Sequence, residues 1–135
     1  MNLEERKQYV EHRIQSAFKT FEAAKVLADN GFPNSAINRL YYSAFYAVNA
    51  LLVKSEIITY THSGAKNQFS LHFIKSKIFD PKLGKLFGEL FDWRQKGDYD
   101  SMYDIDMSLV NSLFAPVEEF LEIIENEIIN TNDNN

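Results

Sequence analysis

Residues 34–55, NSAINRLYYSAFYAVNALLVKS, decide the fold. Their apolar side chains recur at steps of three and four residues, which is the period of one face of an α-helix. The members of this stripe are Ile37, Leu40, Tyr41, Ala44, Phe45, Val48, Leu51 and Leu52. Tyr42, Tyr46 and Ala47 widen it. We therefore expect a helix that is buried on most of its sides.

Helical patterns lie on both sides of this stretch. One apolar stripe predicts a helix from Leu3 to Asn30, and Gly31 supplies the left-handed residue that often ends a helix. After the central helix, a polar connection at 57–61 precedes a shorter predicted helix from Ser63 to Lys77. The chain therefore begins as three helices joined by short connections.

Two more helices follow with clear start signals. Asp80 can cap free backbone N–H groups, and Pro81 suits the first helical position because its missing N–H costs nothing there. This helix is expected to end at Gly97, with a loop after it. Asp106 is expected to cap the last helix, and Pro116 should kink that helix or break it into two pieces.

The whole pattern predicts an all-α protein. No run alternates with the two-residue period of a strand over a useful length, and no internal repeat is visible. Helices joined by mostly short polar loops indicate an antiparallel bundle. The length of 135 residues fits one domain, residues 1–135, with a polar tail at 130–135 that we expect to be frayed.

Composition narrows the function classes. Hydrophobic residues make up 45% of the chain and aromatic residues 14%, which is enough for a real core. The net charge of −5 argues against a broad basic surface for nucleic acid, although a local basic pocket stays open. The chain has no cysteine and no metal-binding motif, so we expect no metal or cofactor. A charged N-terminus and the lack of any long apolar run predict a cytoplasmic protein without a membrane segment.

Arg94 is the first candidate functional residue, in the stretch 91–99, FDWRQKGDY. In one interpretation Arg94 neutralises the end of its helix and pairs with Asp98 or Asp92. In the other, its planar fork holds a phosphate while Tyr99 contacts a sugar, a base or an attacking group. The sequence leaves both open.

A polar row on the central helix forms a second candidate. Arg39, Ser43 and Tyr46 follow one another at spacings of four and three residues, so they share one face. Polar groups inside an apolar helix are costly unless they are paired. They either pair with the acidic residues around Arg94 or line a ligand-binding pocket together with Arg94 and Asp98.

The segment Thr61-His62-Ser63-Gly64 is the third candidate. Thr61 or Ser63 can cap the helix that follows. His62 would then lie beside that helix start, where it is either part of the cap or a catalytic imidazole.

These motifs, in this order, resemble the small stand-alone HEPN proteins of bacteria and archaea. The motifs are AINRLYYSAF at 36–45, THSG at 61–64 and RQKGDY at 94–99, and the similarity extends from about Glu4 to Ile128. The resemblance implies an up-and-down four-helix bundle with a short additional helix, usually paired as a homodimer. It also implies metal-independent RNA cleavage, often as a toxin, or binding of nucleotide, RNA or a nucleotidyltransferase partner.

One departure from the family pattern bears on catalysis. Ribonuclease members carry an Arg, four to six variable residues and then a His, whereas here Tyr99 follows Arg94. A phenol is protonated at neutral pH and is a poor base, so His62 is the candidate replacement for the missing imidazole. We therefore favour a binding or partner module, with a ribonuclease toxin using Arg94, Tyr99 and His62 as the alternative and a purely structural bundle as the third possibility.

A homodimer is also expected from the residues themselves. The aromatic content and the broad apolar face of the central helix exceed what one small bundle needs to bury. Exposed apolar patches of this kind mark interfaces.

Overall fold

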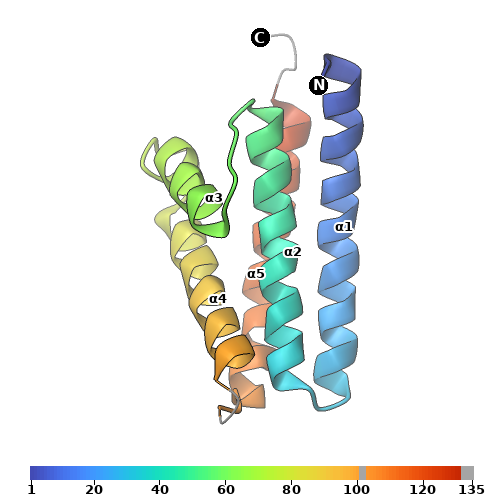
Figure 1. The fold of residues 1–135 in the computed structure, drawn as a ribbon, viewed down its shortest axis with the longest axis vertical. Helices are drawn as coiled ribbons and strands as arrows, with labels where there is room; N and C mark the ends of the chain where they lie inside the picture. Colours follow the sequence, from blue (N-terminus) through green and yellow to red (C-terminus); the bar gives the residue numbers. More distant parts are fainter. Residues whose placement is uncertain (101–102, 132–135) are drawn as a thin grey trace.

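The computed structural model describes residues 1–100 and 103–131, which contain five α-helices, one π-helical turn and no strand (Figure 1). In chain order these are α1 Leu3–Asp29, α2 Pro33–Lys54, α3 His62–Phe69, η1 Ser70–Ile74, α4 Pro81–Tyr99 and α5 Met107–Asn130. The all-helical prediction is confirmed.

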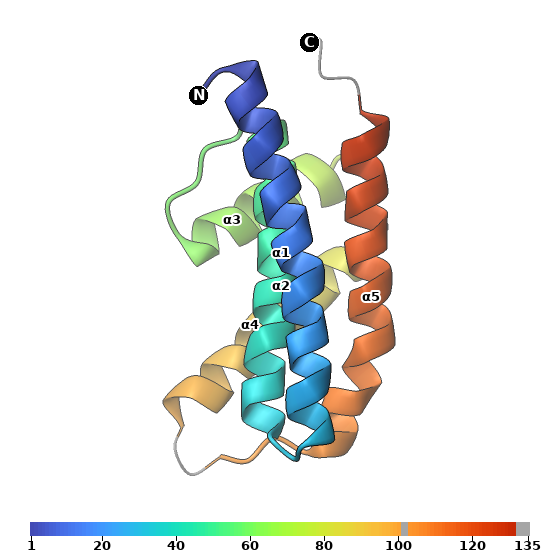
Figure 2. The same ribbon diagram turned by 90° about the vertical axis from the view of Figure 1, so that its right-hand side faces the viewer.

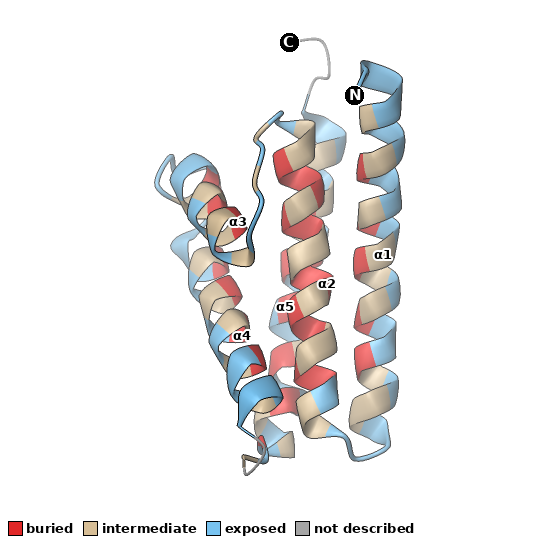
Figure 3. Ribbon diagram, viewed as in Figure 1, coloured by how far each residue is buried: buried red, intermediate tan, exposed pale blue. Residues whose placement is uncertain are grey.

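Four long helices, α1, α2, α4 and α5, run up and down along the long axis (Figures 1 and 2). The central helix α2 contacts α1, α3, α4 and α5. Figure 3 shows that α2 is mostly buried or half-buried, whereas α1 and α4 each keep an exposed outer face. The stretch that predicted the fold is therefore the helix around which the others assemble.

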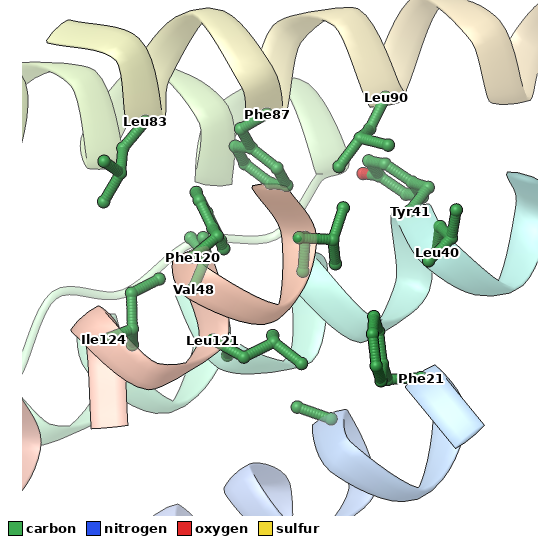
Figure 4. Close-up of a cluster of buried hydrophobic side chains, with 14 of the residues drawn as sticks. Phe21, Leu40, Tyr41, Val48, Leu83, Phe87, Leu90, Phe120, Leu121 and Ile124 are labelled. Carbon is green, nitrogen blue, oxygen red and sulfur yellow. The ribbon is translucent and has the colours of Figure 1, made fainter. Parts of the chain in front are cut away.

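The core is aromatic, as the composition predicts (Figure 4). Tyr41 of α2 stacks on Phe87 of α4 with ring centroids 5.8 Å apart, and Phe87 in turn contacts Phe120 of α5 at 6.0 Å. All three side chains are almost completely buried. Aromatic pairs of this kind contribute roughly 0.5–1.5 kcal/mol beyond the burial of their area.

The predicted helix starts and one predicted stop are confirmed. The side chains of Thr61, Asp80 and Asp106 each accept a hydrogen bond from a backbone N–H at the start of α3, α4 and α5, at 2.8, 2.9 and 2.8 Å. Gly31 has a φ of +83°, the left-handed conformation that glycine adopts at no cost.

One helix differs from the prediction, and one of the two alternatives predicted for Pro116 is excluded. The third predicted helix, 63–77, starts one residue earlier at His62 and becomes the π-turn η1 after Phe69. Pro116 does not break α5, which continues through it as one helix. Pro116 is exposed, so water can satisfy the backbone carbonyl that lacks an N–H partner there.

Helix α4 also runs two residues further than predicted, to Tyr99, and Gly97 lies inside it. A Cβ atom on Gly97 would lie 3.2 Å from Ile105 Cδ1 and 3.5 Å from Asn34 Cβ. The glycine therefore serves close packing and not a helix stop. Asn34 fixes the neighbouring chain, because its side chain donates to the Tyr103 carbonyl and accepts from the Ile105 N–H, both at 2.9 Å.

At the C-terminus, α5 includes Asn130, and the Thr131 hydroxyl donates to the Glu127 carbonyl at 2.6 Å. The rest of the predicted frayed tail, 132–135, lies outside the described residues. Within the described part of the chain, no helix has both the length and the apolar character needed to cross a membrane.

Candidate functional site

Arg94 lies in the last turns of α4, and only 7% of its surface is exposed. Its guanidinium carbon is 4.9 Å from the ring centroid of Tyr41, 5.5 Å from that of Phe91 and 5.8 Å from that of Tyr42. Three rings thus surround one cation, an arrangement that stabilises the charge through the negative faces of the rings.

The neutralisation of Arg94 by hydrogen bonds is incomplete. Its ion pair with Asp98 spans 3.7 Å from Nη1 to Oδ2, which is longer than a charge-assisted hydrogen bond. Its Nε–H is buried and has no hydrogen-bond acceptor among the residues that the structure describes. A buried donor without an acceptor costs ~1–3 kcal/mol, so Arg94 carries a charge that the fold alone does not fully satisfy.

Asp98 connects Arg94 to Arg39. The Asn38 amide donates to both carboxylate oxygens of Asp98, at 3.3 and 3.1 Å. The side-chain Oδ1 of Asn38 accepts from Arg39 Nε and Nη2, at 3.1 and 2.8 Å, and the Arg39 guanidinium also lies over the Tyr42 ring at 5.1 Å. Arg39 therefore reaches Asp98 through Asn38, and in the described residues it forms no ion pair of its own with the acidic residues around Arg94.

His62 reaches the same cluster from α3 through Tyr41. The Tyr41 hydroxyl lies 2.8 Å from His62 Nδ1, and the imidazole packs against the Phe45 ring with centroids 4.5 Å apart. Partial burial, together with the nearby positive charge of Arg94, lowers the pKa of His62. Burial raises the pKa of Tyr41, so its phenol stays protonated and the imidazole beside it is held neutral.

The contact between the Tyr41 hydroxyl and His62 Nδ1 fits either neutral tautomer of the imidazole. Within residues 1–100 and 103–131 this hydroxyl makes no hydrogen bond other than the one to His62. If the hydroxyl donates to Nδ1, the ring hydrogen of His62 is on Nε2, which then donates a hydrogen bond. If Nδ1–H donates to the hydroxyl, Nε2 keeps its lone pair and can accept a proton.

Three of the sequence candidates do not join the cluster. Ser43 is fully buried, and its hydroxyl donates to the Leu40 carbonyl of its own helix at 2.7 Å. Tyr46 lies one turn further along α2, where the Arg13 guanidinium covers its ring at 5.1 Å. Tyr99 is 78% exposed, because five residues after Arg94 a helical side chain points to another face.

Tyr41 is the residue that the sequence analysis placed only in the core stripe. It bridges Arg94 and His62 through its ring and its hydroxyl. A tyrosine at a fully buried helical position requires a partner for its hydroxyl, and that requirement is the signal that could have identified it. No group of three His, Cys, Asp or Glu side chains that could hold a metal ion occurs within the described residues.

The family model of the HEPN domain matches residues 10–127. This chain belongs to the HEPN family. The match covers every helix of the bundle and all residues of the Arg94 cluster, so the predicted resemblance is confirmed together with the fold.

Two relatives of this HEPN domain match over most of their length. A UPF0332 protein of Thermotoga maritima is 32% identical over 91% of this chain and 93% of its own. A protein of Methanocaldococcus jannaschii with the name "Putative toxin" is 34% identical over 93% of this chain and 86% of its own. The matches thus extend over most of this chain and most of both relatives.

Proposed function

We propose that this HEPN domain binds the phosphate of an RNA strand or a nucleotide at Arg94 without cleaving it efficiently. The observation that carries the proposal is the incompletely neutralised guanidinium of Arg94. A phosphate oxygen is an acceptor that a planar arginine fork suits well. Arg39 and the Nε2–H of His62 are further donors at the rim of the cluster.

We propose that the Tyr41 hydroxyl donates to His62 Nδ1, because this buried hydroxyl has no other acceptor in the described residues, and the resulting tautomer favours binding over cleavage. Metal-independent cleavage of RNA needs a base that removes the proton of a ribose hydroxyl and an acid that protonates the leaving oxygen. With its proton on Nε2, neutral His62 donates a hydrogen bond to a phosphate but lacks the free lone pair of a base. Tyr99, the other candidate, faces away from Arg94 and is largely exposed.

The second candidate function is a ribonuclease toxin. It is favoured by the convergence of His62 and Arg94 on one ring, because both contact Tyr41. Cleavage would require Tyr41 to turn its hydroxyl proton away, so that Nδ1 carries the hydrogen and Nε2 becomes the base. Two relatives are named as toxins, which keeps this alternative in the proposal.

We propose that the protein works in the cytoplasm as a homodimer, with a nucleotidyltransferase as a partner in a toxin–antitoxin pair. Half-buried aromatic side chains follow one another along α2 at Tyr42, Phe45 and Tyr46, beside the Arg94 cluster. A second copy covering this stripe would bury it and bring two clusters together. Light scattering should then give about twice the mass of 15.7 kDa, and a monomer would contradict the dimer.

The test combines binding and cleavage by the purified full-length chain. Anisotropy of a fluorescein-labelled oligouridylate measures binding, and gel analysis of the same RNA with a chelator measures cleavage. Wild type should bind, and Arg94→Gln should weaken binding at least about tenfold, the value of one charge-assisted hydrogen bond. The matched control is Arg6→Gln, because Arg6 is paired with Glu56 at 3.0 Å, away from the cluster.

The outcomes separate the candidate functions. Binding that depends on Arg94, without cleavage, supports the proposal. Robust cleavage that disappears in both Arg94→Gln and His62→Ala overturns it in favour of the toxin. Equal affinity of wild type and Arg94→Gln for RNA contradicts Arg94 as the ligand of the phosphate, and the absence of both binding and cleavage in wild type leaves the structural bundle.

A further inference from the structure

Positive charge is concentrated in one part of this acidic chain. Residues 57–88 contain five lysines and one carboxylate, Asp80, so their net charge is +4. The other residues contain nine Lys and Arg against eighteen Asp and Glu, a net charge of −9. The five lysines are Lys66, Lys75, Lys77, Lys82 and Lys85. A local field of this kind acts on a charged ligand even when the net charge of the protein has the opposite sign.

These lysines belong to one corner of the molecule. They lie on α3, on the turn after η1 and on the first turns of α4, on the side of α2 that faces away from α1 (Figure 1). Lys82 pairs with Glu119 at 2.8 Å, and Lys85 lies 4.0 Å from Glu89. Lys66, Lys75 and Lys77 form no ion pair with any carboxylate in residues 1–100 and 103–131. We call these three residues the lysine face.

The turn that carries Lys75 and Lys77 is held by backbone hydrogen bonds and by the packing of two aromatic rings. The Phe79 N–H donates to the Phe73 carbonyl at 2.8 Å, and the two rings stack with centroids 5.6 Å apart. Lys77 has a φ of +67°, a conformation that costs a non-glycine residue about 1 kcal/mol. A lysine is therefore held where glycine would fold more easily, and its charge contributes nothing visible to the turn.

Lys66 connects the lysine face to the Arg94 cluster. It lies one turn after His62 on α3, and its Nζ is 5.2 Å from the centroid of the Phe91 ring. Arg94 lies 5.5 Å from the centroid of the same ring. Lys66 of α3 and Arg94 of α4 therefore lie against the same aromatic ring.

We propose that Lys66, Lys75 and Lys77 hold the phosphodiester backbone of a single-stranded RNA and guide it to Arg94. The inference rests on the proposed function, in which Arg94 binds one phosphate of the strand. Grooves that bind single strands combine positive charge along the backbone with aromatic rings that stack unpaired bases. The half-buried ring of Phe91, which lies next to both Lys66 and Arg94, provides such a surface where the lysine face meets the cluster.

The test compares two triple variants of equal charge. Lys66→Gln, Lys75→Gln and Lys77→Gln together remove the lysine face, and Lys7→Gln, Lys19→Gln and Lys25→Gln together remove three lysines from α1. Affinity for a fluorescein-labelled oligouridylate is measured by anisotropy at several salt concentrations, after thermal melts verify that both variants fold. Loss of the lysine face should weaken binding at least about tenfold and reduce the salt slope by about 2, since each contact with a single strand contributes ~0.7. The α1 variant should stay within about threefold of wild type, because distant exposed charges are screened.

Failure of this inference can be distinguished from failure of the proposed function. Equal losses of affinity in the two triple variants would mean that only the net charge of the protein matters, and would overturn the inference. Unchanged affinity in the lysine-face variant, together with a loss in Arg94→Gln, would overturn it while the proposed function stands. Wild type that does not bind the RNA even at low salt would overturn the proposed function itself.

Discussion

Replacement of Arg94 by methionine should leave the free energy of unfolding within about 1 kcal/mol of wild type. Cation–π contacts with the three rings contribute ~0.5–2 kcal/mol each, and the 3.7 Å pair with the partly exposed Asp98 contributes up to about 1 kcal/mol. Two costs of the buried arginine oppose these contributions: its unsatisfied Nε–H costs ~1–3 kcal/mol, and desolvation of its charge costs several kcal/mol more. Methionine also gains contacts of ~0.3–1.5 kcal/mol with each ring. The stabilising contacts that the substitution removes are therefore nearly balanced by the costs it relieves and the contacts that methionine gains.

Urea unfolding followed by circular dichroism measures this difference, and thermal melts should agree within about 5 °C. Leu90→Ala is the control, because Leu90 is fully buried one turn earlier on α4 and its truncation should cost ~2–5 kcal/mol. A loss of 3–5 kcal/mol in Arg94→Met would equal the cost of breaking a buried ion pair. Arg94 would then be explained by the fold alone, and the argument for a ligand would fail.

Four further predictions concern the cluster and the residues near it. Arg94→Met should raise the pKa of His62 towards its ordinary value, as measured by NMR titration, because a positive neighbour is removed. In the unfolded chain His62 has its ordinary pKa, so stability should fall as the pH drops below that value. The fall should be smaller in His62→Gln, and identical pH profiles of the two proteins would contradict the lowered pKa. Tyr99→Phe should leave RNA binding unchanged, since Tyr99 is exposed away from Arg94; a tenfold loss would place it in the site. Asn34→Ala should cost ~1–3 kcal/mol of stability, because two hydrogen bonds to the chain at 103–105 disappear, and an unchanged urea midpoint would contradict that role.

The sequence predicted the helices well, because their signals are local. The apolar stripes, the caps at Asp80 and Asp106, and Gly31 depend only on nearby residues. Gly97 was misjudged, because its role depends on Ile105 and Asn34, which approach it only in the folded chain. Of the two outcomes predicted for Pro116, the break does not occur, since the exposure of Pro116 makes a free carbonyl tolerable.

The site was predictable only in part. The pairing of Arg94 with Asp98 was one of the interpretations that the sequence offered, from the rule that charges in apolar stripes need partners, whereas the contact of Arg39 with Asn38 was not foreseen. The approach of His62 to Tyr41 depends on how α3 packs against α2, and no local pattern contains that information. The helical period places Tyr99 on a different face of α4 from Arg94. Tyr99 was expected in the site because of the family motif and not because of its spacing from Arg94.

The most direct test of Arg94 as a phosphate ligand is its own Nε–H signal in a 15N NMR spectrum, assigned by its absence in Arg94→Met. Titration with the oligouridylate should shift this signal and the His62 ring signals together, because both groups donate to the bound phosphate. The Arg6 Nε–H signal, from a guanidinium already paired with Glu56, should not move. RNA that shifts surface lysine signals but leaves the Arg94 Nε–H signal in place would contradict the account.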